Sequence, residues 1–404
     1  MTDVSESGFK EVTRVAEARE RLLEAVSPHG RTDRVPLRVA DGRVLAESVV
    51  ADRNVPHYAR AAMDGWAVRA ADTFGAGDRS PAVLRESEGR VGPDEAVRVH
   101  TGSEVPDGAD AVVMVEDTER FGDEVEVFDA VAGGENVAPA GEDVEAGQPL
   151  YEVGHRLRPS DLGLLKAVGI TRVEVYEQPT VGVVPTGEEL VEHDPEPGEV
   201  IETNGLTVSR YVRRWGGRAE YRNVVTDDES ALRAAIERDL TKDVVVTTGG
   251  SSVGERDLIP EVVADLGEVL VHGVALKPGH PCALGVVRDT PVVMLPGYPV
   301  ACIVNAVQFL RPLLKHLEGG TLPPHPTRPA TLTRKVASEP GVRTFARVRL
   351  EAGDGEVLAT PTRASGSGVL SSVALADGWV VVPEGLEGYD EGAEVAVEDW
   401  EYAP

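Results

Sequence analysis

Residues 247–257, written TTGGSSVGERD, combine groups that bind anions with groups that bind cations. The glycine pair permits positive φ, and a chain turning from a strand into a helix directs several free N–H groups at one point. The hydroxyls add donors, and the two carboxylates can coordinate a cation or hold a water. The segment therefore predicts a site for an oxyanion or phosphate with a metal nearby, formed by Thr248, Gly249, Gly250, Ser251, Ser252, Gly254, Glu255 and Asp257.

The same residues also fit a tight strand-to-helix turn with a serine cap, because glycine pairs are common in such turns. No Gly-Lys-Ser/Thr follows, so the segment is not a Walker loop, and its glycine spacing is not a dinucleotide fingerprint. The elements around it must decide between a plain turn and a binding site.

Strand-like and helix-like segments alternate on both sides of this loop. Apolar runs at 180–184, 218–225, 244–246 and 291–295 are separated by helical patterns. Residues 178–325 therefore predict a doubly wound parallel sheet, in which ligands gather outside the carboxyl ends of the strands. Four loops fall at that edge: PTGEE at 185–189, TDD at 226–228, the opening segment, and PGYP at 296–299.

The rest of the chain has a different character. A helical pattern covers 11–26, short β-rich segments fill 45–145, a capped helix is expected at 159–169, and the last eighty residues indicate a small β module after a linker at 319–329. Two motifs in the β-rich part, AAMDGWA and GEDV, carry Asp64 and Asp143. Taken alone, each is better explained as a turn or a solvated acidic loop.

Composition limits the function. The chain has 404 residues and a net charge of −29, and only six of its forty basic residues are lysine. This surface is typical of a very salty cytoplasm, where the Debye length is about 3 Å at 1 M salt, and it argues against a nucleic-acid partner. Cys282 and Cys302 match neither a metal spacing nor a disulfide framework, so core packing is expected. Without a signal peptide or an apolar stretch near 18 residues, we expect a soluble, cytoplasmic protein with no membrane partner.

A series of nine motifs resembles the molybdopterin molybdenumtransferase family, which comprises the MoeA proteins and the E domain of gephyrin. In order they are AAMDGWAV, TGSEVPDGADAVVMVED, GED, PTGEEL, TN, VTDD, TTGGSSVGERD, LKPGHP and LPGYPV. The resemblance covers essentially the whole chain. It implies an elongated linking domain (1–44 and 147–177), a β-rich lid domain (45–146), a molybdopterin-binding αβ domain (178–325) and a C-terminal β barrel (326–404).

The resemblance also implies an activity and its residues. Molybdate would be inserted at the dithiolene of adenylylated molybdopterin with release of AMP and with Mg²⁺ as cofactor. The active site would be shared between the subunits of a homodimer. The implied catalytic residues are Asp64, Asp143, Asp227, Asp257 and Lys277, of which Asp227 and Asp257, with Glu255, would hold the metal. Substrate contacts would come from the opening loop and from Pro278, Gly279, His280, Pro296, Gly297, Arg347 and Ser367.

The chain departs from the family pattern at several positions. His280 stands where a second lysine is common, Tyr298 where an asparagine is common, Ala301 where a serine is common, and Ser251 where a valine is common. These changes leave tungstate open as the oxyanion. A molybdopterin adenylyltransferase and a non-catalytic scaffold or oxyanion-binding protein also remain as alternatives. The lid and barrel domains argue against the first, and the retained acids and Lys277 argue against the second.

Overall fold

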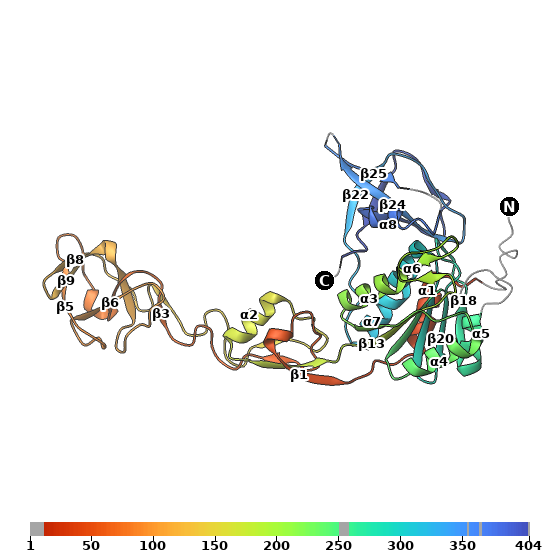
Figure 1. Cartoon of the computed structure of the whole chain (residues 1–404). Helices are drawn as coiled ribbons and strands as arrows, with labels where there is room; N and C mark the ends of the chain where they lie inside the picture. Colours follow the sequence, from red (N-terminus) through yellow and green to blue (C-terminus); the bar gives the residue numbers. More distant parts are fainter. Residues whose placement is uncertain (1–11, 250–257, 354, 363–365, 403–404) are drawn as a thin grey trace. The chain divides into compact units, whose positions relative to one another are not determined.

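The computed structural model describes residues 12–249, 258–353, 355–362 and 366–402 (Figure 1). It divides the chain into two compact units. The first contains Met1–Asp33, Gly42–Val44 and Tyr176–Pro404, and the second contains Arg34–Asp41 and Leu45–Val175. Residues 250–257, which make up most of the TTGGSSVGERD segment, lie outside the described residues.

A six-stranded sheet forms the centre of the first unit. Its order is β16 (Arg218–Tyr221), β13 (Thr180–Pro185), β17 (Val244–Thr248), β21 (Thr290–Leu295), β20 (Ala283–Val287) and β18 (Glu268–His272). β13 pairs in parallel with β16 and β17, and β17 pairs in parallel with β21. Every residue of β17 and β21 is buried, as expected for strands covered on both faces.

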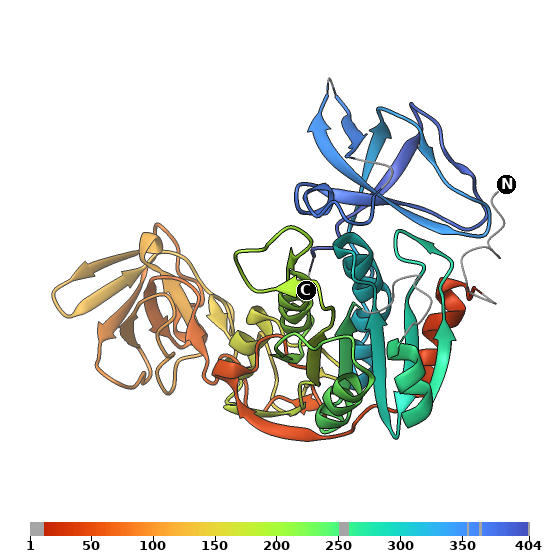
Figure 2. The same ribbon diagram turned by 45° about the vertical axis from the view of Figure 1, so that its right-hand side comes forward.

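Helices cover both faces of this sheet (Figures 1 and 2). One face packs against α1 (Val15–Glu24), α3 (Asn204–Arg214), α6 (Pro299–Asn305) and α7 (Arg311–Leu317), and the other packs against α4 (Glu229–Asp239) and α5 (Leu258–Leu266). The doubly wound architecture expected from the sequence is thereby confirmed. Cys282 and Cys302 are free and buried within the first of these cores, as expected.

One part of the sheet differs from the expectation of wholly parallel strands. β20 runs antiparallel to both β21 and β18, so the sheet is mixed. Only Arg288 and Asp289 connect β20 to β21, and Arg288 has a φ of +57°. A two-residue connection can make a hairpin but cannot make the long crossover that a parallel pair needs.

The C-terminal part closes into a five-stranded barrel. The strands follow the order β24 (Arg343–Ala352), β25 (Val357–Pro361), β22 (Thr327–Leu332), β28 (Glu394–Glu398) and β26 (Gly378–Val382), and β26 pairs back with β24. β22 takes in the last three residues of the expected linker. The short strand β19 (Leu276–Lys277) pairs in parallel with β24, so a segment of the αβ region extends the barrel sheet.

The second unit is β-rich, as expected. Its main sheet has the order β7 (Ala111–Met114), β4 (Gly65–Val68), β6 (Glu95–Val99), β5 (Ala82–Glu86), β9 (Glu124–Val127) and β8 (Thr118–Phe121). A separate core forms around α2 (Pro159–Ala167), where Leu165 is completely buried. Among the described residues, no helix is long and apolar enough to span a membrane.

Candidate functional site

The carboxyl end of β17 leads into the glycine turn that the sequence singled out. Gly249 has a φ of +135°, and a Cβ added there would lie 2.1 Å from the carbonyl oxygen of Thr186. The Gly249 amide donates to the carbonyl of Leu295 at 3.1 Å. Only glycine permits this conformation and this close approach, so the ends of β13, β17 and β21 meet at Gly249.

Buried hydroxyls surround this turn. Thr186, Thr247 and Thr248 are each about 1% exposed, and their Oγ1 atoms have no hydrogen-bond partner among the described residues. Buried polar groups normally have a hydrogen-bond partner, so these hydroxyls indicate a place where a polar ligand can bind. The predicted residues Gly250, Ser251, Ser252, Gly254, Glu255 and Asp257 lie outside the described residues.

Asp227 lies near two further acids at the same edge of the sheet. Burial, followed by the charges of Glu189 and Glu188, raises the pKa of its carboxyl above the usual range, and a hydrogen bond from the backbone of Glu188 opposes that shift. The Oδ1 atom of Asp227 is buried and has no partner among the described residues. A cation here would relieve both the repulsion and the missing contact.

The donor set at Asp227 fits magnesium, since carboxylate oxygens are the ligands that this hard cation prefers. Within the described parts of the chain, however, no three His, Cys, Asp or Glu side chains are grouped closely enough to hold a metal ion. Magnesium is commonly held by one or two carboxylates together with substrate phosphates and waters. Asp227 is suited to that kind of partial site.

Lys277, Pro278, Gly279 and His280 form a loop that contacts α6. The Nδ2 atom of the buried Asn305 donates to the carbonyl of Gly279 at 2.8 Å and to that of Ala301 at 2.9 Å. Gly279 has a φ of +115°, and a Cβ on it would lie 2.3 Å from Asn305 Nδ2. Burial, together with the nearby charge of Lys277, lowers the pKa of His280, which favours the neutral imidazole.

The Lys277 side chain is held only loosely. Its Nζ atom lies 2.9 Å from Glu339 Oε1, and the two side chains are 53% and 64% exposed. An exposed ion pair of this kind contributes about 0–1 kcal/mol. Lys277 can therefore exchange Glu339 for an anionic ligand at little cost.

The loop that carries Pro296 and Gly297 joins the same group. Gly297 approaches Gly249 closely, because a Cβ on Gly297 would lie 3.5 Å from the Gly249 Cα. Its carbonyl accepts a hydrogen bond from the buried Asn204 at 2.6 Å. Ser367 reaches this loop from the barrel, where its carbonyl accepts from the Val300 amide at 3.0 Å.

Arg347, which the resemblance implies as a substrate contact, is buried in the barrel region. It is 2% exposed, burial lowers its pKa, and its guanidinium donates to Phe345 O and Ser372 Oγ, both at 3.3 Å. Among the described residues, no carboxylate pairs with it. Arg343, at the start of the same strand, forms an ion pair with Glu384 at 3.1 Å.

Asp64 and Asp143 both belong to the second unit. The Asp64 Oδ1 atom accepts hydrogen bonds from the Thr101 amide at 2.6 Å and the Thr101 hydroxyl at 2.9 Å, which lower the pKa of its 55% exposed carboxylate. Asp143 is exposed, and its amide donates to Val55 O at 2.9 Å. The strands β3 (Arg60–Ala61) and β10 (Val137–Ala138), which precede the two acids, pair with each other.

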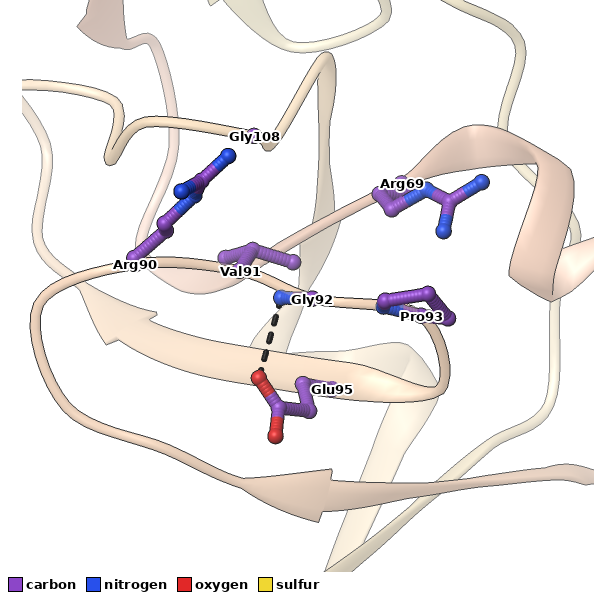
Figure 3. Close-up of a pocket in the computed structure, with 7 residues that line it drawn as sticks. All are labelled: Arg69, Arg90, Val91, Gly92, Pro93, Glu95 and Gly108. Atoms are coloured by element: carbon purple, nitrogen blue, oxygen red, sulfur yellow. Dashed lines mark hydrogen bonds between the residues drawn. The ribbon is translucent and has the colours of Figure 1, made fainter.

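A cavity of about 470 Å³ also lies in the second unit, and Figure 3 shows the residues that line it. The Gly92 amide on its wall already donates to Glu95 at 2.9 Å. None of the predicted site residues lines this cavity, whose lining residues are Arg69, Arg90, Val91, Gly92, Pro93, Glu95 and Gly108. It is therefore separate from the strand-end site, the group of residues around Gly249 at the carboxyl ends of β13, β17 and β21.

The structure adds residues that the sequence did not assign. Around the edge of the αβ sheet these are Thr186, Glu188, Glu189, Asn204 and Asn305, and in the second unit Thr101 contacts Asp64. Glu188 and Glu189 stand in the PTGEEL motif, so their position at a strand end was the available signal. Asn204 stands in the TN motif and Asn305 lies within a helical pattern, and nothing local in the sequence shows which loop each one contacts.

Models of protein families match three consecutive regions of the chain, and all three concern molybdopterin biosynthesis. The model of the MoeA N-terminal region (domain I and II) matches residues 13–169, that of a probable molybdopterin binding domain matches 182–316, and that of the MoeA C-terminal region (domain IV) matches 329–400. These three regions contain the β-rich unit, the αβ sheet and the barrel described above.

Individual relatives agree with these matches. The chain is 36% identical over 390 residues to a putative molybdopterin biosynthesis protein of Methanocaldococcus jannaschii, with 94% of each chain covered. It is 33% identical over 385 residues to the molybdopterin molybdenumtransferase of Bacillus subtilis, covering 91% of this chain and 90% of that protein. The crystal structure of the molybdopterin biosynthesis MoeA protein from Pyrococcus horikosii superposes with a TM-score of 0.83 at 36% identity, covering 96% of this chain and 99% of that one.

The chain therefore belongs to the MoeA family, which confirms the family identified from its motifs.

Proposed function

We propose that this protein inserts molybdate at the dithiolene of adenylylated molybdopterin and releases AMP. As a member of this family it is a transferase of molybdenum cofactor biosynthesis. The observation that most supports the finer proposal is the chemistry at the carboxyl edge of the αβ sheet. There, buried hydroxyls lie around Gly249 and a buried carboxylate oxygen belongs to Asp227, and none of these atoms has a hydrogen-bond partner among the described residues. One set suits an oxyanion, and the other suits a cation.

The residues of the chain would divide the work by chemical type. The hydroxyls and backbone amides around Gly249 would bind phosphate oxygens. Lys277, released from Glu339, would pair with a phosphate or with the oxyanion as a mobile point charge. Asn305, by holding the carbonyl of Gly279, would fix the loop from which Lys277 projects.

Asp227, with Glu255 and Asp257, would hold Mg²⁺, which when bound would neutralise charge on the pyrophosphate oxygens. Asp64 would act as an ionised acid, because Thr101 holds its pKa low. We further propose that Asp64 and Asp143 belong to a site completed by a second copy of the chain in a homodimer.

The decisive experiment incubates purified protein with adenylylated molybdopterin, Mg²⁺ and either molybdate or tungstate, and measures AMP release together with metal in the product. The proposal expects release that depends on Mg²⁺ and on molybdate. Stronger dependence on tungstate would change the oxyanion. ATP consumption with molybdopterin would indicate an adenylyltransferase instead. A protein that shows neither activity would have a non-catalytic role.

A further inference from the structure

Tyr298 is an exposed aromatic residue at the strand-end site. Tyr298 is 63% exposed, whereas Leu295 and Val300 on either side of it are completely buried. No side-chain hydrogen bond to another described residue accounts for its position. A large aromatic side chain exposed at a binding site is a candidate contact for a flat ligand.

The backbone that carries Tyr298 is fixed on several sides. The carbonyl of Gly297 accepts from Asn204 at 2.6 Å, and the carbonyl of Tyr298 itself accepts from the Cys302 amide at 2.9 Å. The Val300 amide donates to Ser367 at 3.0 Å. These contacts give the ring a defined base within an exposed loop.

The ring rests against the barrel. A Cβ placed on Gly368 would lie 3.3 Å and 3.5 Å from two carbons of the Tyr298 ring. Glycine at 368 therefore lets the chain pass close to the ring, while much of the ring stays open to solvent. Tyrosine loses little conformational freedom on contact, since it has only two side-chain torsions.

The residue before Tyr298 lies against the proposed anion-binding turn at Gly249. A Cβ placed on that residue, Gly297, would lie 3.5 Å from the Gly249 Cα. A ligand whose phosphates occupy the Gly249 turn would thus bring its adjoining groups near Tyr298.

We propose that Tyr298 is a stacking platform for a flat nitrogen heterocycle of the substrate. The proposal rests on the proposed function, because adenylylated molybdopterin offers two such groups, the adenine and the pterin. Stacking on an aromatic side chain tolerates different heterocycles, since each presents a π face.

The test measures the Kd of AMP and of a soluble pterin separately, by calorimetry, for the parent protein, Tyr298→Phe and Tyr298→Ala. Tyr298→Ala is expected to raise the Kd of one ligand by roughly 5- to 150-fold, and Tyr298→Phe to leave it within about twofold, because the ring remains. The ligand affected identifies the heterocycle. Tyr402→Ala, which removes another exposed tyrosine, should change neither Kd.

Three results would overturn the platform: equal binding by all variants, an equal loss in Tyr298→Phe and Tyr298→Ala, or binding of neither ligand by the parent. The first excludes a contact, and the second assigns the effect to the hydroxyl. These measurements need no turnover. A parent protein that fails to release AMP from the substrate while showing the expected Kd pattern would refute the proposed function and leave the platform in place.

Discussion

The carboxylate of Asp227 lies beside Glu188 and Glu189, and burial adds to the cost of its charge. Its raised pKa means that folding favours the protonated form more than the unfolded chain does. The ionised form therefore lowers stability at neutral pH, and this penalty disappears as the pH falls through the folded-state pKa. We expect Asp227→Asn to have a higher Tm than the parent at pH 7, with the difference shrinking toward about pH 4.

The same substitution should reduce AMP release by about a hundredfold, which corresponds to roughly 2.7 kcal/mol of transition-state stabilisation. Mg²⁺ should raise the Tm of the parent more than that of the variant. Asp228→Asn is the matched control, because Asp228 caps α4 by accepting from the Ala231 amide at 2.9 Å and an asparagine keeps that cap. Full activity in Asp227→Asn would remove this carboxylate from the site.

Lys277 should contribute much to binding and little to stability. Its exposed ion pair with Glu339 contributes about 0–1 kcal/mol, so Lys277→Ala is expected to unfold in urea almost as the parent does. Substrate affinity should fall by about tenfold or more, since a charge-assisted contact is worth about 1.5–3 kcal/mol. Glu339→Gln is the control, and it should bind substrate at least as well as the parent. Unchanged substrate affinity in Lys277→Ala would refute the role.

At the scale of single residues, the sequence predicted positions whose surroundings are local. Gly249 follows a strand and needs its glycine conformation, and both facts can be read from neighbouring residues. The burial of Arg347 could not be predicted, because it depends on barrel strands that come from distant parts of the chain. The hydrogen bonds from Thr101 to Asp64 join residues 37 positions apart, so no local pattern indicates them.

The end of α6 anchors a loop that carries a predicted catalytic residue. We expect Asn305→Ala to destabilise the protein by about 1–3 kcal/mol, because it removes both hydrogen bonds and leaves the Gly279 carbonyl without this donor. Substrate KM should rise as well, since the Lys277 loop loses its anchor. Urea unfolding and steady-state kinetics would measure the two effects.

Thr207→Ala serves as the control for that change. It removes a hydrogen bond from Thr207 Oγ1 to the carbonyl of Thr203, which lies four residues earlier in the chain. It should leave KM unchanged. An Asn305→Ala protein with lowered stability and normal KM would restrict Asn305 to a structural role.

Strands and helices of the αβ region were predictable because buried strands are continuous apolar runs and the helices have an apolar face. The direction of the strands was harder to predict. β20 and β21 together resemble other apolar runs, and their antiparallel pairing depends on a two-residue connection. The start of β22 was not predicted, because Pro329 and its neighbours have the composition of a linker.

For the whole molecule, the net charge of −29 predicts a response to salt. If the acidic excess is a solvated surface, unscreened repulsion should destabilise the fold in dilute buffer. We expect a higher Tm in molar potassium chloride than at low salt. A Tm that is the same in both would refute this interpretation of the acidic surface.

The proposed homodimer makes a separate prediction. Light scattering should give about twice the 42.9 kDa mass of the chain. Mixing Asp64→Ala with Asp227→Asn, each nearly inactive alone, should restore part of the AMP release if one site draws on two chains. An active monomer would contradict the shared site.

The first unit is assembled from segments on both sides of the second, and this has a consequence during synthesis. Val15, Ala18 and Leu22 of α1 are completely buried in a core shared with residues of β18, α7 and the π-helical turn at 306–310. A ribosome adding about 5–20 residues per second would need roughly ten seconds to a minute to deliver those partners. Throughout that interval the apolar face of α1 lacks its native neighbours, and all of the second unit is synthesised before those neighbours appear. The newborn chain therefore has a period in which a chaperone can bind its N-terminal segment.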